Sequence, residues 1–131
     1  PASARSYELA SLASLESAAI VDFLMALPEP SDRVVRAVYA ATDWLASVKL
    51  RGLKYEKYQL TRDAGAAPLW GRLYELGTNR VIMANRDGIK LYDWNQLTDR
   101  RAGYGWYTTK PAATLVAFAR WSRSHPRPSI R

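Results

Sequence analysis

Apolar residues recur at the spacing of a helix in three stretches of the chain. The first stretch covers residues 15–27, where the spacing i, i+3, i+4, i+7 predicts an amphipathic helix that ends before Pro28 and Pro30. We expect the buried side of this helix to consist of Ile20, Phe23, Leu24 and Leu27.

The second stretch, residues 32–50, has apolar residues at alternating spacings of four and three. Ser31 precedes it and offers a hydroxyl group that can cap the N-terminus of a helix. Because a short Pro-Glu-Pro turn joins the two stretches, we expect two helices packed side by side and antiparallel. The expected buried seam of the second helix is Val34, Val38, Ala41, Leu45 and Val48.

The third stretch, residues 112–123, predicts a last helix that begins after Pro111, a position where a helix tolerates proline. Its expected inward residues are Leu115, Phe118 and Ala119. Residues 124–131 hold prolines and arginines and little to bury. We therefore expect one module over residues 1–123 and a flexible tail over residues 124–131.

Shorter extended segments are expected between the second and third helices. Residues 53–62, 69–76 and 81–83 have strand-like composition or a weak alternation of apolar and polar positions. Residues 85–88 are a strong turn signal, and Gly88 suits a positive φ, so residues 89–94 are the expected return strand of a hairpin. Asp93 or Asn95 is expected to cap a short helix that runs to residue 101.

Length and composition limit the class of protein. A chain of 131 residues is about one domain, and 48% hydrophobic with 24% charged residues is ordinary for a globular fold. No apolar run is long enough to span a membrane as a helix. The chain has no cysteine, which excludes disulfides and thiol catalysis, and its single histidine, His125, argues against a histidine metal site or a Ser-His-Asp triad.

The charge of the chain suggests an anionic partner. The net charge is +7, and 14 of the 19 basic residues are arginine, whose planar group can bind a carboxylate or phosphate at two points. Five Trp and eight Tyr residues add faces on which rings can stack. Nucleic acid and acidic polysaccharide both remain possible partners on this evidence. Local pairing of the arginines with acidic residues on a solvated surface is the simpler alternative.

Two groups of arginines stand out as candidate binding residues. Arg5 lies close to an aromatic and an acidic residue ahead of the first helix, and a surface ion pair between Arg5 and Glu8 would also explain that pattern. Arg72, Arg80 and Arg86 lie in extended or turn segments that also carry aromatic residues. Such a set can line a groove for carboxylated sugars, or the arginines can stabilise their turns.

Several motifs follow one another in a specific order. They are Arg5-Ser6-Tyr7-Glu8-Leu9, Ser14-Leu15-Glu16-Ser17, Phe23-Leu24-Met25, residues 69–76 (LWGRLYEL), Thr78-Asn79-Arg80, Arg86-Asp87-Gly88, and residues 100–107 (RRAGYGWY). Together, from Arg5 to about Trp121, they resemble the C-terminal part of the catalytic module of family 10 pectate lyases. The chain departs from the family pattern at Gly71, Leu73 and Val81, where Ala, Phe and Pro are expected. These departures concern packing more than chemistry.

The resemblance implies a mainly α fold, part of an α/α-toroid-type lyase module with a few short β-strands. It also implies that the chain works with an N-terminal part of the same enzyme. The start of the sequence, without Met or a signal peptide, favours a chain that begins inside a longer protein. Secretion is implied by the family alone.

The implied reaction is β-elimination in α-1,4-polygalacturonate. A base removes the C5 proton and the C4 oxygen leaves, which gives 4,5-unsaturated oligogalacturonides. The resemblance assigns the base to Arg5 and the binding of substrate carboxylates to Arg86 and, less directly, to Arg80. It also implies a calcium cofactor whose ligands are expected mainly outside this chain, so no residue of the chain is assigned as a metal ligand.

The alternative interpretation is a non-catalytic binding module for an anionic polymer, either an acidic polysaccharide or a nucleic acid. The sequence lacks a Lys/Arg-rich stripe on one helix and any recognisable nucleic-acid-binding motif. We therefore expect polygalacturonate as the partner, and neither nucleic acid nor a membrane. The isolated chain is expected to be nearly inactive.

Overall fold

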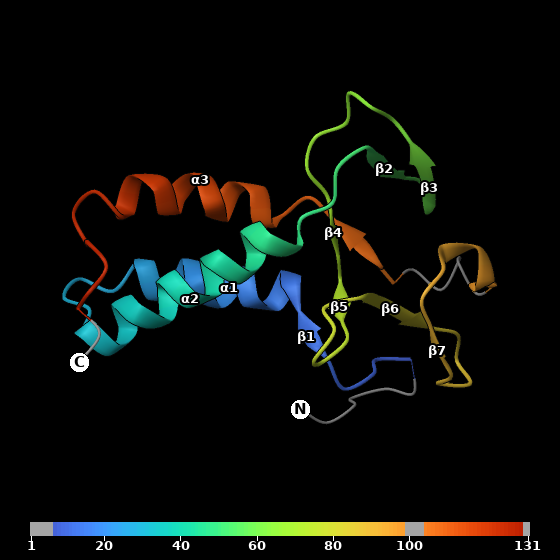
Figure 1. The fold of residues 1–131 in the computed structure, drawn as a ribbon, viewed down its shortest axis with the longest axis horizontal. Helices are drawn as coiled ribbons and strands as arrows, with labels where there is room; N and C mark the ends of the chain where they lie inside the picture. Colours follow the sequence, from blue (N-terminus) through green and yellow to red (C-terminus); the bar gives the residue numbers. More distant parts are fainter. Residues whose placement is uncertain (1–6, 99–103, 130–131) are drawn as a thin grey trace.

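A computed structural model describes residues 7–98 and 104–129 of the chain. Three α-helices lie at one end of the molecule and the short strands lie at the other (Figure 1). The helices are α1 (Ser14–Met25), α2 (Asp32–Val48) and α3 (Pro111–Trp121). Helix α1 packs against both α2 and α3.

Helix α2 has the capping that the sequence predicts and part of the predicted buried seam, since Val34 and Ala41 are only partly buried. The side chain of Ser31 accepts a hydrogen bond from the backbone N–H of Val34 at 3.2 Å. Val38, Leu45 and Val48 are buried as expected, and Val35 and Thr42 complete the buried side. Figure 1 shows α1 and α2 running in opposite directions, as the Pro-Glu-Pro turn predicts.

The predicted buried side of α1 is wrong. Ile20 and Phe23 keep 59% and 68% of their surface exposed, whereas the buried residues are Ser14, Ala18 and Val21. Small residues on the buried side allow α1 to approach its neighbours closely. The hydroxyl of Ser14, for example, donates a 2.6 Å hydrogen bond to the backbone oxygen of Gly71.

Helix α3 buries Pro111 and Thr114, while Leu115 and Phe118 are partly buried. Ala119, which the sequence predicts to face inward, is exposed. The chain after α3 lies against α2, since the Tyr39 hydroxyl donates to the backbone oxygen of His125 at 2.8 Å and Arg127 pairs with Asp43 at 3.0 Å. The division into residues 1–123 and 124–131 stays a prediction.

The strands are two to four residues long and all pair antiparallel. Strands β1 (Leu12–Ala13), β5 (Leu73–Tyr74), β6 (Val81–Ala84) and β7 (Lys90–Leu91) form one sheet in the order β1-β5-β6-β7. Strands β2 (Leu53–Glu56) and β3 (Gln59–Arg62) form a hairpin. Strand β4 (Trp70–Gly71) pairs with β8 (Tyr107–Thr108).

The short helix that the sequence predicts up to residue 101 is a single 3-10 turn, Trp94–Gln96. The Asp93 side chain caps this turn by accepting the N–H of Asn95. Residues 99–103 lie outside the described part of the chain.

The fold class expected from the resemblance is wrong for this chain. The described residues form three α-helices and eight antiparallel strands, a small mixed α and β domain and not an α/α toroid with a few strands. Strands this short hold too few residues for a reliable alternation of apolar and polar positions. The resemblance also implied the architecture of the whole family module, whereas this chain corresponds to only one part of that module.

The strands and helices share a core. Trp70 and Tyr74 are both 1% exposed and pack with Ala18, Leu45 and Val48. The Trp70 indole N–H donates to the backbone oxygen of Leu45 at 2.8 Å, and the Tyr74 hydroxyl donates to that of Val48 at 2.9 Å. These buried bonds fix the strand end of the molecule to the last turn of α2.

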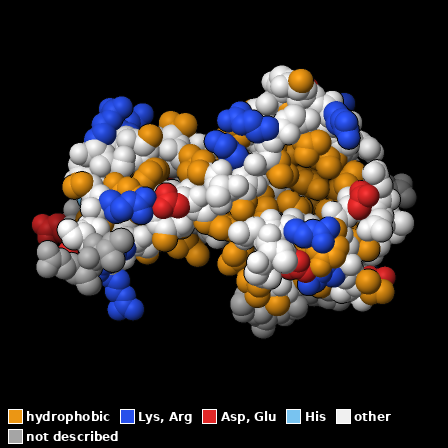
Figure 2. Space-filling model, viewed as in Figure 1, with side chains coloured by type: hydrophobic (Ala, Val, Ile, Leu, Met, Phe, Trp, Pro, Cys, Tyr) orange, Lys and Arg blue, Asp and Glu red, His pale blue; other side chains and the backbone are white. Residues whose placement is uncertain are grey.

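A second, aromatic core lies within the strand end. It includes Tyr104, Trp106 and Tyr107 together with Trp94, all less than 9% exposed. On the surface of this end, Figure 2 shows apolar side chains with Lys and Arg side chains around them. Arg72, Arg80 and Arg86 belong to this end of the molecule.

Candidate functional site

Arg5, the base that the resemblance predicts, lies outside the described residues. The residues that follow it from Tyr7 onward are described. The ring of Tyr7 makes edge contacts with Tyr104 and Trp106, with ring centroids 5.1 and 6.3 Å apart. The segment that begins at Tyr7 is therefore anchored on residues 104–106.

Arg72, which lies between β4 and β5 in the sequence, also contacts residues 104–106. Its backbone N–H donates to the oxygen of Trp106 at 2.8 Å, and its own backbone oxygen accepts from Ser14 at 2.9 Å. Its guanidinium lies 4.4 Å above the ring of Tyr104 and donates to Glu16 at 2.8 Å. The position of this cation is thus fixed by α1 and by residues 104–106.

One donor of Arg72 is left over. Its Nε is buried and has no hydrogen-bond partner among the described residues. A buried donor without a partner is uncommon in a folded protein, because it costs about 1–3 kcal/mol, and at functional sites it often awaits a ligand. The arrangement therefore offers a free N–H on a fixed positive charge.

Electrostatics keep Arg72 charged. Desolvation lowers its pKa, but the hydrogen bond to Glu16 and interactions with Tyr104, Glu16 and Glu8 outweigh that effect and raise the pKa. Burial, together with a hydrogen bond to Glu8, also raises the pKa of Tyr104. Arg72 is therefore suited to bind a carboxylate and unsuited to accept a proton.

Arg86 lies in the turn that the sequence predicts. The N–H of Gly88 donates to the oxygen of Asn85 at 3.0 Å, and Gly88 has a φ of 77°. The carboxylate of Asp87 accepts the N–H of Ile89 at 2.9 Å. The side chain of Arg86 is exposed at this turn between β6 and β7.

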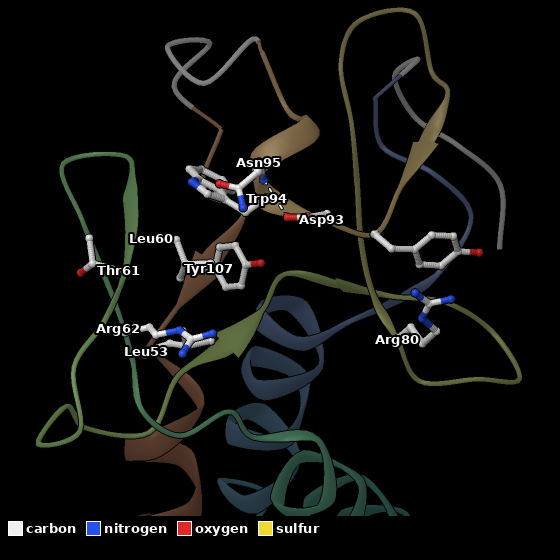
Figure 3. Close-up of a pocket in the computed structure, with 10 residues that line it drawn as sticks. Leu53, Leu60, Thr61, Arg62, Arg80, Asp93, Trp94, Asn95 and Tyr107 are labelled. Atoms are coloured by element: carbon white, nitrogen blue, oxygen red, sulfur yellow. Dashed lines mark hydrogen bonds between the residues drawn. The ribbon is translucent and has the colours of Figure 1, made fainter.

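Arg80 has different surroundings from Arg72. Its guanidinium lies 3.8 Å above the ring of Tyr92, and it lines a pocket of about 500 Å³ (Figure 3). Neither Arg72 nor Arg86 lines this pocket. The structure therefore assigns the three arginines to separate features of the strand end.

A network around Glu75 supports Arg80 and its aromatic partner. Glu75 accepts hydrogen bonds from Thr78, from Tyr92 and, at 2.8 Å, from Lys90. Hydrogen bonds from Lys90, Thr78 and Tyr92 lower the pKa of Glu75 to about 2. This carboxylate fixes the Tyr92 ring on which Arg80 rests.

The sequence did not single out Arg62, and it gave Glu16 only as part of a motif, without a role. Arg62 lines the same pocket as Arg80 and reaches it from β3. The spacing of Leu60 and Arg62, two residues apart on one strand, is a signal that could have placed them on one face. Glu16 binds Arg72 across 56 positions of sequence, and no local pattern reports such a pair.

Within residues 7–98 and 104–129, no group of three or more His, Asp or Glu residues could hold a metal ion. The described residues therefore do not by themselves fit a calcium ion. In the same part of the chain, no helix is long and apolar enough to cross a membrane.

Comparison with known proteins decides the family. The model of the pectic acid lyase family matches residues 1–115. The chain belongs to this family. The resemblance to pectate lyases noted in the sequence is therefore confirmed, while a search of curated proteins gave no match.

Two solved structures of a lyase resemble this chain. The first is a family 10 polysaccharide lyase from Cellvibrio cellulosa, with 35% identity, a TM-score of 0.81 and 92% of this chain covered. The second is a mutant of a family 10 polysaccharide lyase from Cellvibrio cellulosa in complex with trigalacturonic acid, with 35% identity and a TM-score of 0.82. This chain spans 39% of the length of either one.

Proposed function

We propose that the chain is part of a pectate lyase that cleaves α-1,4-polygalacturonate by β-elimination. The observation that carries the proposal is the 35% identity, over 92% of the chain, to a lyase whose structure holds trigalacturonic acid. The fixed, charged guanidinium of Arg72, close to the segment that begins at Tyr7, supports it. Secretion belongs to the same proposal, because a polymeric substrate has to be met outside the cell.

The proposed chemistry needs a base and cations. Removal of the C5 proton leaves negative charge that spreads onto the adjacent carboxylate, and the C4 oxygen then departs to leave a C4–C5 double bond. Donors already aimed at that carboxylate stabilise the charge as it develops. We assign Arg5 as the base and Arg72 and Arg86 as carboxylate-binding residues; Arg80 is considered with its pocket below.

A calcium cofactor remains a prediction. The described residues offer no cluster of ligands for calcium. The catalytic and binding roles proposed above are therefore assigned only to side chains of this chain.

We also propose that the chain works together with a further part of a longer polypeptide. The chain spans 39% of the two solved lyases. Ile20 and Phe23 on α1 and Val116 on α3 are 59%, 68% and 65% exposed, although they are large and apolar. Exposed apolar groups on helices are typical of surfaces that another segment covers.

The test compares binding with product formation. The full-length polypeptide that carries this chain is passed over a polygalacturonate gel and an oligonucleotide column at the same moderate salt, and a polygalacturonate digest is assayed for 4,5-unsaturated ends. We expect retention by polygalacturonate and release of unsaturated ends. Retention without unsaturated ends would indicate a binding module, and preference for the oligonucleotide would overturn the proposal.

A further inference from the structure

The pocket of Figure 3 lies between the β2–β3 hairpin and residues 92–95. Leu53, Leu60, Thr61 and Arg62 line it from the hairpin, Trp94 and Tyr107 line it from the aromatic core, and the exposed Asn95 lines it beside Trp94. Its volume of about 500 Å³ falls within the range of small-ligand pockets.

Arg62 is a cation without a partner in this pocket. Among the described residues, no carboxylate or hydrogen-bond acceptor is bound to its side chain. Figure 3 shows its guanidinium reaching from β3 toward the ring of Tyr107. The side chain is exposed and lines the pocket, so it is accessible to an anion bound there.

Tyr107 presents a hydroxyl to the same space. Its ring is held by Tyr55 and Trp94, with centroids 5.4 and 5.7 Å away, and it is 8% exposed. The hydroxyl has no hydrogen-bond partner among the described residues, and burial raises the pKa of Tyr107 to about 12. The group is therefore a rigidly held, protonated donor.

Arg80 adds a second positive charge. It rests on the ring of Tyr92, and the nearby carboxylate of Glu75 is bound by Lys90, Tyr92 and Thr78 instead. The acidic residue that lines the pocket, Asp93, uses its Oδ1 to cap the N–H of Asn95 at 2.9 Å. The pocket thus combines two guanidinium groups, the hydroxyl of Tyr107, the carboxylate of Asp93 and apolar side chains from the hairpin.

We propose that this pocket binds a uronate unit of an acidic polysaccharide, with Arg62 facing its carboxylate and Tyr107 donating to an oxygen of the sugar, while Arg80 lines the opposite side of the pocket. The proposal rests on the proposed function, because it takes polygalacturonate as the polymer. It adds a binding position to the group around Arg72. The two binding positions have separate aromatic surroundings. Tyr104 and Trp106, near Arg72, pack on Tyr7, whereas Tyr107 in the pocket packs on Tyr55 and Trp94.

The test measures the affinity of the full-length polypeptide for a galacturonate oligomer by calorimetry. Arg62→Gln removes the charge and keeps a polar side chain, and Tyr107→Phe removes the hydroxyl and keeps the ring packing. Arg51→Gln is the matched control, because Arg51 precedes the same hairpin, is exposed and does not line the pocket. Chromatography after each titration checks that the oligomer is intact, and melting temperatures check folding.

We expect Arg62→Gln to weaken binding by about tenfold, the usual scale of a charge-assisted hydrogen bond at a partly open site, and Tyr107→Phe to weaken it several-fold. Arg51→Gln should bind as the unchanged protein does. The fully methyl-esterified oligomer, which lacks the carboxylate charge, should bind equally well to the unchanged protein and to the Arg62→Gln variant.

Two outcomes would overturn the proposal while the proposed function stands. One is unchanged affinity of both variants for the acidic oligomer. The other is a lower melting temperature of Arg62→Gln without loss of affinity, which would show that Arg62 has a structural role only. If the unchanged protein does not bind the oligomer at all, the proposed function fails and this inference fails with it.

Discussion

Arg72 combines a fixed position, a positive charge and an unused donor. Glu16 and the ring of Tyr104 hold its guanidinium, and its Nε is buried without a partner among the described residues. Glu16 accepts one N–H and leaves other donors of the group available. A carboxylate that reaches Nε would complete the hydrogen bonding of a cation that is already in place, and so would cost little reorganisation.

Replacement of Arg72 by Gln should lower kcat/KM on polygalacturonate by roughly 10- to 150-fold. This is the effect of losing a charge-assisted hydrogen bond of about 1.5–3 kcal/mol. Steady-state kinetics on the full-length polypeptide measure it. Arg33→Gln, at an exposed position on α2, is the control and should change nothing. A fall in melting temperature with unchanged kcat/KM would show that Arg72 is structural only.

The sequence predicted part of this site. The turn of Arg86 could be predicted because the residues that form it are adjacent, and Gly88 adopts the expected positive φ. The partners of Arg72 could not be predicted, because Glu16 and Tyr104 come from segments that lie far from Arg72 in the sequence. Arg5 and the roles of Arg80 and Arg86 stay predictions.

The short strands depend on side-chain links between them. Glu75 follows β5, while Lys90 belongs to β7 and Tyr92 follows it, so the Glu75 network ties β5 to the far edge of the sheet. Because the strands hold few backbone hydrogen bonds, such links matter more than in a long sheet.

This network predicts a loss of stability in acid. The pKa of Glu75 is about 2 in the folded chain, below the ordinary value of 4.5. A carboxylate with a lowered pKa stabilises the fold above its unfolded pKa, and this stabilisation is lost as pH falls from about 4.5 toward 2. Melting temperatures of Glu75→Gln should therefore depend less steeply on pH over this range. Glu29→Gln, an exposed change in the loop between α1 and α2, should keep the original slope; an equal slope in both variants would contradict the assignment.

Gly71 and Val81 are coupled departures from the family pattern. A Cβ atom on Gly71 would lie 2.5 Å from Cγ1 of Val81, well inside contact distance. Gly71→Ala should therefore destabilise the chain by about 1–3 kcal/mol through overpacking. Val81→Ala removes the obstructing methyl groups, so the double variant should recover most of the loss. Denaturation of the four forms in a double-mutant cycle measures the coupling, and strictly additive effects would refute it.

Prediction from sequence located the helices and most of the strands, including the hairpin of β6 and β7, but it missed β1 and β8. Helices α1, α2 and α3 lie where the apolar spacing put them, because each is at least eleven residues long. The hairpin of β2 and β3 was predicted as one extended segment, because its turn residues, Lys57 and Tyr58, have positive φ values of 52° and 59° without glycine or asparagine. The exposed side of α1 could not be foreseen either, since burial depends on what the helix packs against.

At the scale of the whole molecule, the exposed apolar side of α1 should matter only in the longer polypeptide. Phe23→Ser should change the melting temperature of the isolated chain very little, because Phe23 is 68% exposed there. The same change should lower the melting temperature and the activity of the full-length polypeptide, if the proposed further segment covers it. Ile89→Ser, at a residue 64% exposed in the strand end, is the control and should be neutral in both forms. An equal effect of Phe23→Ser on the two forms would contradict the proposed contact.

The isolated chain should be nearly inactive for a related reason. The described residues provide cations for a carboxylate but no cluster of metal ligands, and the chain covers 39% of the solved lyases. Its activity on polygalacturonate, measured with and without added calcium, should remain close to the background. Strong calcium-dependent turnover by residues 1–131 alone would show that the chain holds a complete site.

The most direct test of the proposed function is the rate at which the full-length polypeptide forms 4,5-unsaturated ends from polygalacturonate, before and after Arg5→Ala. We predict ultraviolet-absorbing product from the unchanged protein and a loss of several orders of magnitude in kcat for the variant, with substrate binding and melting temperature nearly unchanged. A folded Arg5→Ala protein that keeps its kcat, or an unchanged protein that forms no unsaturated product, would contradict the proposed function.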